Sequence, residues 1–243
     1  MKAQLEISSL SKAFGGNAVL DRVDLEVAAC AVSAVIGPNG AGKTTLFNAI
    51  SGFVPPDRGR ITLEGVELVG MPPHRIAELG VGRTFQNLRL FPRLTVLENV
   101  LVALDRTERR QSRRRRQVQA RALLERAGVS ASPDTFASDL SFAEQKFVSL
   151  ARALACGHRI LLLDEPGSGL DPPSLERMYA LVRSLAAEGR TILLIEHNLD
   201  VVRELAERVV FLDRGRALAR GTPAQVFASP EAANSYFGGE PEP

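Results

Sequence analysis

The chain has 243 residues, of which 45% are hydrophobic and 24% charged, and its formal net charge is +2. This composition is ordinary for a soluble globular protein of one large domain, and a charge this small does not by itself indicate a nucleic-acid partner. The longest apolar runs, such as residues 160–163 and 209–212, are too short to cross a bilayer, and the N-terminus lacks the apolar core of a signal peptide. We therefore expect a cytoplasmic protein that reaches a membrane only through a partner.

The N-terminal part of the chain has the pattern of half-buried strands. Apolar and polar residues alternate over residues 5–7 and 23–27, which predicts strands with one buried face. Further short strands are predicted at residues 61–63 and 66–69, and turns at residues 15–17 and 55–57.

A glycine-rich segment lies between the apolar run 32–36 and the apolar segment 46–50. It consists of Gly37, Pro38, Asn39, Gly40, Ala41, Gly42, Lys43, Thr44 and Thr45, and it fits the phosphate-binding pattern G-x-x-x-x-G-K-[ST]. The glycines permit positive φ, so that backbone N–H groups can approach phosphate oxygens at the N-terminus of the following helix. Lys43 is expected to reach the β- and γ-phosphates, and the Thr44 hydroxyl to bind Mg²⁺. The sequence therefore predicts a nucleoside triphosphate site.

Residues 95–127 carry no strand pattern, and their apolar residues recur at helical spacing. We expect a helical insertion over residues 87–138, within a single domain that spans residues 1–243. The insertion contains an arginine-rich run at residues 109–116. We interpret this run as a solvated helix face or loop, and contact with anionic lipid headgroups or nucleic acid is the alternative.

The second half of the chain alternates between strands and helices. Two continuous apolar runs, residues 160–163 and 191–195, predict strands that are buried on both faces. Helical patterns cover residues 143–156 and 173–188. This alternation predicts an α/β fold with a parallel sheet covered by helices.

Two acidic residues follow the first of these strands. Asp164 is predicted to hold Mg²⁺, directly or through water. Glu165 is then placed where it can polarise an attacking water as a general base. Capping of the next helix is the structural alternative, and the phosphate-binding loop upstream makes it the weaker interpretation.

The order and spacing of several motifs resemble the ATPase domain of ABC transporters. The motifs are the phosphate-binding loop and residues 164–166, 168–171 and 195–197. Gln86 matches the glutamine of that family's Q-loop, and Phe14 the aromatic residue that it places against adenine. The resemblance covers nearly the whole chain. It implies a P-loop NTPase core with a parallel sheet, an N-terminal antiparallel β subdomain and an inserted α-helical subdomain.

The resemblance also implies a role for individual residues, with ATP and Mg²⁺ as the bound species. Gln86 would sense the metal or the attacking water and link the site to the helical insertion. Asp171 would face an opposing protomer across a dimer. His197 would contact the γ-phosphate and position Glu165.

The family's signature, Leu-Ser-Gly-Gly-Gln, corresponds to residues 140–145, where Phe142 and Ala143 stand in place of glycines. Ser141 and Glu144 predict a capping box at a helix start, whose free N–H groups can still face a phosphate. The methyl group of Ala143 is expected to push the backbone away from the γ-phosphate. A positive φ at this residue would cost roughly 1 kcal/mol or more.

In this family each ATP lies between the P-loop of one ATPase subunit and the signature of the other. The resemblance therefore implies that Ser141, Phe142, Ala143 and Glu144 act on the ATP of a second ABC ATPase subunit, in a homo- or heterodimer. The altered signature lies in the same chain as an intact set of catalytic residues. We hypothesise an asymmetric heterodimer whose two sites hydrolyse ATP unequally.

Residues 82–100, 195–199 and 221–223 are similar to the ATPase subunits of branched-chain amino-acid uptake systems. This similarity implies two integral membrane permease subunits, a periplasmic or extracellular solute-binding protein, and no nucleic-acid partner. It also implies a peripheral position on the cytoplasmic face of the inner membrane. The apolar residues near Gln86 are candidates for the cleft that grips the permeases, with internal packing as the alternative; they are Leu88, Leu90, Phe91 and Leu94.

Other members of the family share much of this pattern. The ATPase of lipopolysaccharide export and the ATPases of urea or amide importers are alternatives within the transporters. A soluble ABC ATPase of translation or DNA repair is the alternative from a different class. The transported solute is not encoded in this chain.

Overall fold

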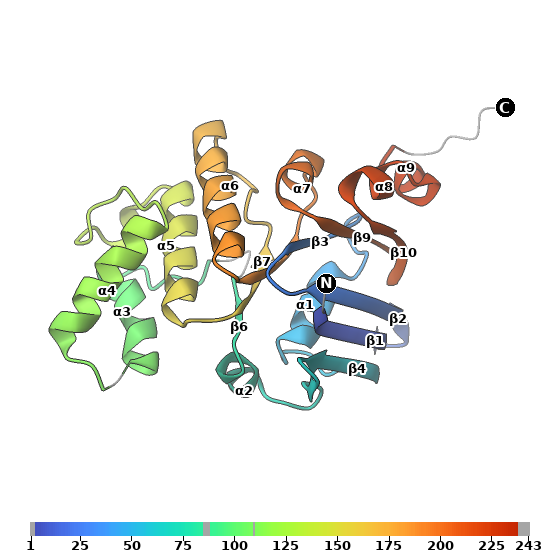
Figure 1. Cartoon of the computed structure of the whole chain (residues 1–243), viewed down its shortest axis with the longest axis horizontal. Coiled ribbons are helices and arrows are strands. Elements are labelled where there is room, and N and C mark those ends of the chain that lie inside the picture. The colour runs from blue at the N-terminus through green and yellow to red at the C-terminus, as the bar shows by residue number, and fades with distance from the viewer. Residues whose placement is uncertain (1–2, 85–87, 109, 238–243) are drawn as a thin grey trace.

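The computed structural model describes residues 3–84, 88–108 and 110–237. It places two β-sheets beside a group of helices (Figure 1). The N-terminal sheet is antiparallel and has the order β2-β1-β4-β5. Its strands are β1 (Ala3–Phe14), β2 (Asn17–Ala28), β4 (Arg58–Leu63) and β5 (Val66–Glu67). The strand expected over residues 66–69 ends at Glu67, because the carboxylate of Glu67 accepts hydrogen bonds from the backbone N–H groups of Ile61 and Val69.

The main sheet has the order β10-β9-β3-β8-β7-β6. Its pairs are parallel except for β9 and β10. The strands are β3 (Val32–Ile36), β6 (Val81–Arg83), β7 (Ile160–Asp164), β8 (Thr191–Ile195), β9 (Arg208–Asp213) and β10 (Arg216–Gly221). Because β3, β7 and β8 run in parallel, their carboxyl ends meet at one edge of the sheet, which is where ligands bind in open α/β sheets.

Helices and loops make up the rest of the described chain. They are α1 (Lys43–Ile50), α2 (Pro73–Glu78), α3 (Val96–Thr107), α4 (Arg113–Arg126), the 3₁₀ turn η1 (Ala137–Asp139), α5 (Phe142–Ala155), α6 (Pro172–Ala187), α7 (Leu199–Leu205), α8 (Pro223–Phe227) and α9 (Pro230–Phe237). The helices predicted over residues 143–156 and 173–188 correspond to α5 and α6. The α/β class and the N-terminal antiparallel sheet are confirmed.

The hydrophobic core lies on both faces of the main sheet, because successive side chains of a strand point to opposite faces. Ile160 and Leu162 of β7 join a cluster with α1 and the N-terminal sheet. Leu161 and Leu163 join the other cluster, with α5, α6 and α7. Helix α1 is therefore enclosed between the two sheets, which fixes the loop that precedes it.

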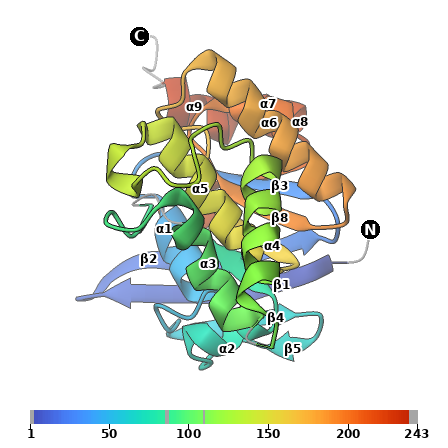
Figure 2. The same ribbon diagram turned by 90° about the vertical axis from the view of Figure 1, so that its left-hand side faces the viewer.

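Helices α3, α4 and α5 form one group at the side of the molecule (Figures 1 and 2). Helices α3 and α4 fall inside the range expected for the insertion, 87–138, and both pack on α5. The start of that range lies outside the described residues, so its boundaries remain a prediction. The buried Asn99 of α3 accepts a hydrogen bond from Phe91 N and donates to Phe91 O, Leu94 O and Thr95 O. This side chain fixes the segment that leads into the helix group.

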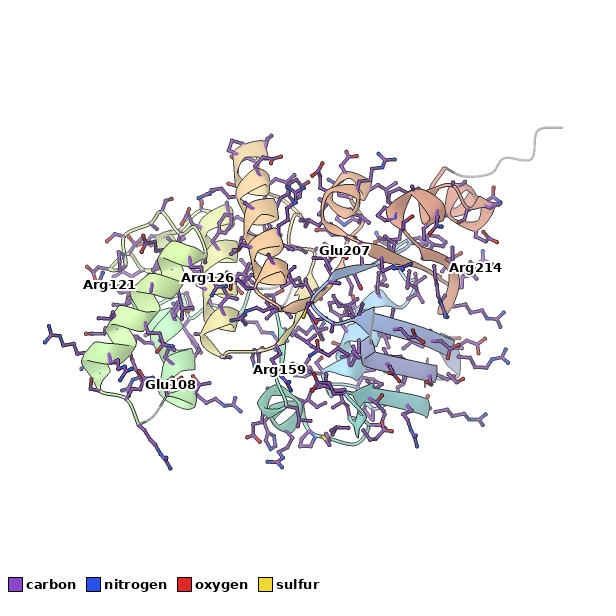
Figure 3. All side chains as sticks on the ribbon, in the orientation of Figure 1. Glu108, Arg121, Arg126, Arg159, Glu207 and Arg214 are labelled. Carbon is purple, nitrogen blue, oxygen red and sulfur yellow. The ribbon has the colours of Figure 1, made fainter. Side chains whose placement is uncertain are left out.

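Most of the described arginine-rich run lies on α4. Arg113, Arg114 and Arg115 are exposed, and Arg116 pairs with Asp105 at 2.7 Å. The view with side chains shows charged residues such as Arg121 and Arg126 farther along the same helix (Figure 3). The geometry supports the interpretation of this run as a solvated helix face.

Candidate active site

The glycine-rich loop joins β3 to α1 at the carboxyl edge of the main sheet. Gly42 caps α1 with a φ of 104°, and Gly40 has a φ of 82°. These are left-handed conformations that glycine adopts without the steric cost of a Cβ. The loop therefore ends on the N-terminus of a helix, where unpaired N–H groups and the helix dipole favour a phosphate.

Two of the loop glycines lie against neighbouring backbone. A Cβ added at Gly37 would lie 1.9 Å from the carbonyl oxygen of Leu212 in β9, and one at Gly42 would lie 2.6 Å from the carbonyl oxygen of Val19 in β2. A Cβ at Gly40, by contrast, would meet nothing within 4 Å. The loop is thus held tightly at both ends and is open in its middle.

Lys43 is the buried cation of this loop. Its ammonium donates to the carbonyl oxygens of Gly37 at 2.6 Å and Pro38 at 2.8 Å. Burial lowers the pKa of Lys43, while the negative charges of Glu165 and Asp164 act in the opposite direction. The predicted lysine and the two predicted acids are therefore close enough to interact.

Asp164 ends β7 and is paired with an arginine that sequence reasoning missed. The Arg83 guanidinium, on the adjacent strand β6, donates to Asp164 Oδ2 at 3.2 Å, and both side chains are buried. Arg83 also donates to Asn48 Oδ1 at 2.7 Å and Ser51 Oγ at 3.0 Å, at the end of α1. Burial raises the pKa of Asp164, and the hydrogen bond from Arg83 opposes this. Arg83 thus ties α1, β6 and β7 together directly behind the predicted metal ligand.

Glu165 and His197 come together although 31 residues separate them in the sequence. His197 Nδ1 lies 3.4 Å from Glu165 Oε1. The backbone N–H of Glu165 donates to Ile195 O at 3.0 Å, which joins the end of β7 to the end of β8. Because these two strands pair in parallel, the residues that follow them meet at the same edge.

The signature segment differs from its expected geometry in two respects. Ser141 caps α5 by accepting from Glu144 N at 3.2 Å, but the carboxylate of Glu144 does not return to Ser141. It accepts instead from Ser130 N, Ser130 Oγ and Ala131 N, so the predicted capping box is only half formed. Ala143 lies in the first turn of α5 and has no positive φ, so the backbone strain considered for this residue is absent. Ala143 therefore avoids the conformational cost of a positive φ.

Three further residues were predicted for the site, and the structure describes two of them. Asp171 is the N-cap residue of α6, is exposed, and makes no capping hydrogen bond with its side chain. Phe14 ends β1, is 47% exposed, and lies 5.3 Å from Lys12 Nζ, measured to the ring centre. Gln86 lies outside the described residues.

A family model described as ABC transporter matches residues 20–168, which is more than half of the chain. This chain belongs to the ABC transporter family. The high-affinity branched-chain amino acid transport ATP-binding protein BraF of Pseudomonas aeruginosa is 39% identical over 96% of this cassette and 97% of its own length. The protein of the same description, LivG, of Escherichia coli is 36% identical over the same shares of the two chains.

Solved ATP-binding cassettes have the same fold. A nucleotide-free cassette from an ABC transporter matches with a TM-score of 0.88 and 29% identity, over 98% of this chain and 100% of that chain. A dimeric post-hydrolysis state of a cassette bound to ADP and Pi matches with a TM-score of 0.83 and 26% identity, over 90% of this chain and 98% of that chain. The family expected from the motifs is confirmed, and the cassette is an ATPase subunit of an ABC transporter. In the part of the cassette that the structure describes, no helix has the length and apolar character that a membrane span requires.

Proposed function

We propose that this subunit hydrolyses ATP at a site completed by a second ATPase subunit, and that it thereby drives uptake of branched-chain or related amino acids. The observation that carries the proposal is the meeting of Lys43, Asp164 and Glu165 at the end of the parallel strands, with His197 beside Glu165. Residues 37–45 would hold the triphosphate, and the exposed ring of Phe14 would stack on adenine. Gln86 would link the site to the helical insertion.

Glu165 is the general base in this proposal. Its carboxylate would accept a proton from the attacking water. General base catalysis by a positioned side chain typically raises the rate of such a reaction by roughly 10²- to 10⁴-fold. His197 lies within 3.4 Å of that carboxylate and is half exposed, so it can position Glu165 and contact the γ-phosphate. Lys43 would exchange its two carbonyl partners for charged phosphate oxygens, which are stronger acceptors.

The donor set fits Mg²⁺. Asp164 offers a carboxylate and Thr44 an exposed hydroxyl, and both are oxygen ligands of the kind that Mg²⁺ prefers. The described residues contain no cluster of three or more His, Cys, Asp or Glu side chains that could hold a metal ion. This agrees with a cation held by one carboxylate, one hydroxyl, phosphate oxygens and water. Bound there, Mg²⁺ would neutralise developing charge on the phosphates.

The second subunit would supply the missing side of the site. The likeness to a dimeric cassette supports a dimer in which Ser141, Phe142, Ala143 and Glu144 approach the partner's ATP. Asp171, exposed and without a capping bond, is free to face the partner across the seam. The altered signature supports an asymmetric heterodimer.

Replacing Ala143 by glycine tests the asymmetry. We expect the ATPase rate of the assembled transporter to rise several-fold, because a smaller residue at the start of α5 lets its N–H groups approach the partner's γ-phosphate more closely. The matched control is Ala122→Gly on α4, an exposed alanine outside the signature, where glycine also costs about 1 kcal/mol of helix stability. Unchanged ATPase and transport in Ala143→Gly would count against the hypothesis.

Two permeases and an external binding protein are the proposed transport partners. The relatives BraF and LivG are described as branched-chain amino acid transport proteins, which favours an importer with two permeases and an external binding protein. A hollow of about 250 Å³ lies between the segment after Gln86 and the start of α5, and it would receive side chains of a short permease helix; its lining includes Leu88, Leu90, Pro92, Phe142 and Gln145. The subunit would then sit on the cytoplasmic face of the inner membrane.

Purification of the tagged subunit from its natural host tests this assignment. We expect two integral membrane proteins and a second ATPase to co-purify in detergent, with ATPase activity stimulated by a solute-binding protein loaded with a branched-chain amino acid. Stimulation by a urea- or amide-loaded binding protein would select the alternative importers. Recovery of the subunit without any membrane protein would contradict the transporter proposal.

A further inference from the structure

Two buried charged residues lie beneath the turn that carries Glu165, and none of the assigned motif roles uses them. Lys146 of α5 is 8% exposed, and Glu196, directly after β8, is 0% exposed. The sequence signal for both is a charged residue inside a mainly apolar segment, since buried charges are rare unless they are paired or hydrogen-bonded. Their partners therefore indicate what they do.

Lys146 binds the carbonyl groups of the turn. Its ammonium donates to Glu165 O at 2.7 Å, Pro166 O at 3.2 Å and Ser168 O at 2.5 Å. These three bonds use the full donor capacity of a lysine. The ammonium also lies 5.3 Å from the centre of the Phe142 ring, one helical turn earlier in the signature.

Glu196 binds the same turn through a backbone N–H group. Its Oε1 accepts from Gly167 N at 2.9 Å, and a Cβ added at Gly167 would lie 3.2 Å from this oxygen. Its Oε2 is buried and has no hydrogen-bond partner among the residues that the structure describes. Burial raises the pKa of Glu196 and lowers the pKa of Lys146, and the negative charge of Glu196 opposes the lowering at Lys146. The two opposite charges therefore interact across the turn.

The turn itself has an unfavourable backbone conformation. Glu165 has a φ of 49°, which is uncommon for a residue with a side chain and persists when the surroundings over-determine it. The backbone N–H of Glu165 is held by Ile195 O, the carbonyls of the turn by Lys146, and the N–H of Gly167 by Glu196. Together these bonds fix the direction in which the Glu165 carboxylate points.

The start of α5 is in contact with the same segment. A Cβ added at Gly169 would lie 2.9 Å from Cε1 of the Phe142 ring, so this ring packs directly on the residues that follow the turn. Phe142 and Lys146 lie on one face of α5, four residues apart. The start of α5 is therefore joined to the turn and the residues that follow it by one ring contact and three hydrogen bonds.

We propose that Lys146 and Glu196 are positioning residues that clamp the turn 165–168 from α5 and from β8, and so link the signature of one site to the general base of the other. This inference rests on the proposed role of Glu165 in hydrolysis. In the proposed dimer the start of α5 would touch the partner's ATP, whereas Glu165 would act on the ATP held by its own P-loop. The clamp then makes the orientation of Glu165 depend on occupancy of the opposite site.

The experiment compares Lys146→Met, Lys146→Arg, Glu196→Gln and Glu196→Ala with the exposed-carboxylate control Glu176→Gln. The first measurement is hydrogen–deuterium exchange of the purified subunit without nucleotide. We expect exchange at residues 165–170 to accelerate tenfold or more in Lys146→Met and Glu196→Ala, and exchange in α4 to stay unchanged. We expect smaller increases in exchange for Lys146→Arg, which keeps charged donors, and for Glu196→Gln, which keeps an acceptor. These two conservative variants show whether faster exchange comes from the lost hydrogen bonds or from general unfolding.

The second measurement is ATP hydrolysis by the assembled transporter. We expect kcat to fall tenfold or more in Lys146→Met and Glu196→Ala with KM for ATP within twofold of the wild type, because the P-loop is untouched. In a Glu165→Gln background the same substitutions should lower kcat no further, because they act only through Glu165. A general loss of stability would instead lower kcat in both backgrounds.

Wild-type exchange at residues 165–170 in both Lys146→Met and Glu196→Ala would overturn the clamp. An undiminished kcat in these variants would also overturn it, provided that Glu165→Gln itself abolishes turnover. The failure of the proposed function gives a different result. If Glu165→Gln keeps its turnover while the clamp variants still exchange faster, the general-base assignment fails and the clamp itself stands.

Discussion

Replacing Glu165 by glutamine is expected to lower kcat for ATP hydrolysis by roughly 10²- to 10⁴-fold, because the variant keeps the shape of the side chain but loses the base that accepts the proton from water. Binding of ATP should persist, since Lys43 and residues 37–45 are unchanged. The measurement is steady-state phosphate release by the assembled transporter, together with the affinity of the subunit for a fluorescent ATP analogue. The loss should be confined to the chemical step.

The exposed residue Glu207 provides a matched control for Glu165. Glu207→Gln makes the same chemical change away from the nucleotide site and should hydrolyse ATP at the wild-type rate. His197→Ala should lower kcat less than Glu165→Gln, because His197 positions the base and does not itself accept the proton. Turnover by Glu165→Gln at the wild-type rate would remove the central residue of the proposed mechanism.

Replacing Gly37 by alanine is expected to destabilise the fold by roughly 3 kcal/mol or more, which is the range of severe core overpacking. The new Cβ would lie 1.9 Å from the carbonyl oxygen of Leu212, so either the loop or β9 must move. The φ of Gly37 is 148°, a conformation that residues with a side chain rarely adopt, which adds strain. The free energy of unfolding, measured with urea on the purified subunit, should fall accordingly.

Gly40→Ala separates this steric effect from the strain of a positive φ. Gly40 has a φ of 82° and open space around it, so alanine there should cost only about 1–2 kcal/mol of unfolding free energy. The variant should remain folded at room temperature, and any weakening of ATP affinity would then report on phosphate approach alone. Equal destabilisation by the two substitutions would contradict the tight packing of the loop against β9.

Local features of the chain were predicted well from the sequence. The P-loop, the strands that end at Asp164 and Ile195, and the helices α5 and α6 each depend on contiguous residues whose spacing matches one element. Burial on both faces makes β7 and β8 continuous apolar runs, and the alternation of strands and helices predicts the parallel sheet. The short strand β6 was missed, because three residues, Val81–Arg83, carry too little pattern to be distinguished from a loop.

The partners of charged side chains were decided by the tertiary structure. Arg83 meets Asp164 only because β6 pairs with β7, and Glu144 leaves its own helix for Ser130 although the local pattern favours a capping box. The same holds for Lys146 and Glu196, whose bonds join the turn after β7 to two other elements. By itself the sequence determined the family and the fold class, and it predicted the residues of the nucleotide site, because these depend on motifs of short-range spacing. Only the folded chain determined which buried charges hold those residues in place, because such pairs depend on strand order and on contacts between distant segments.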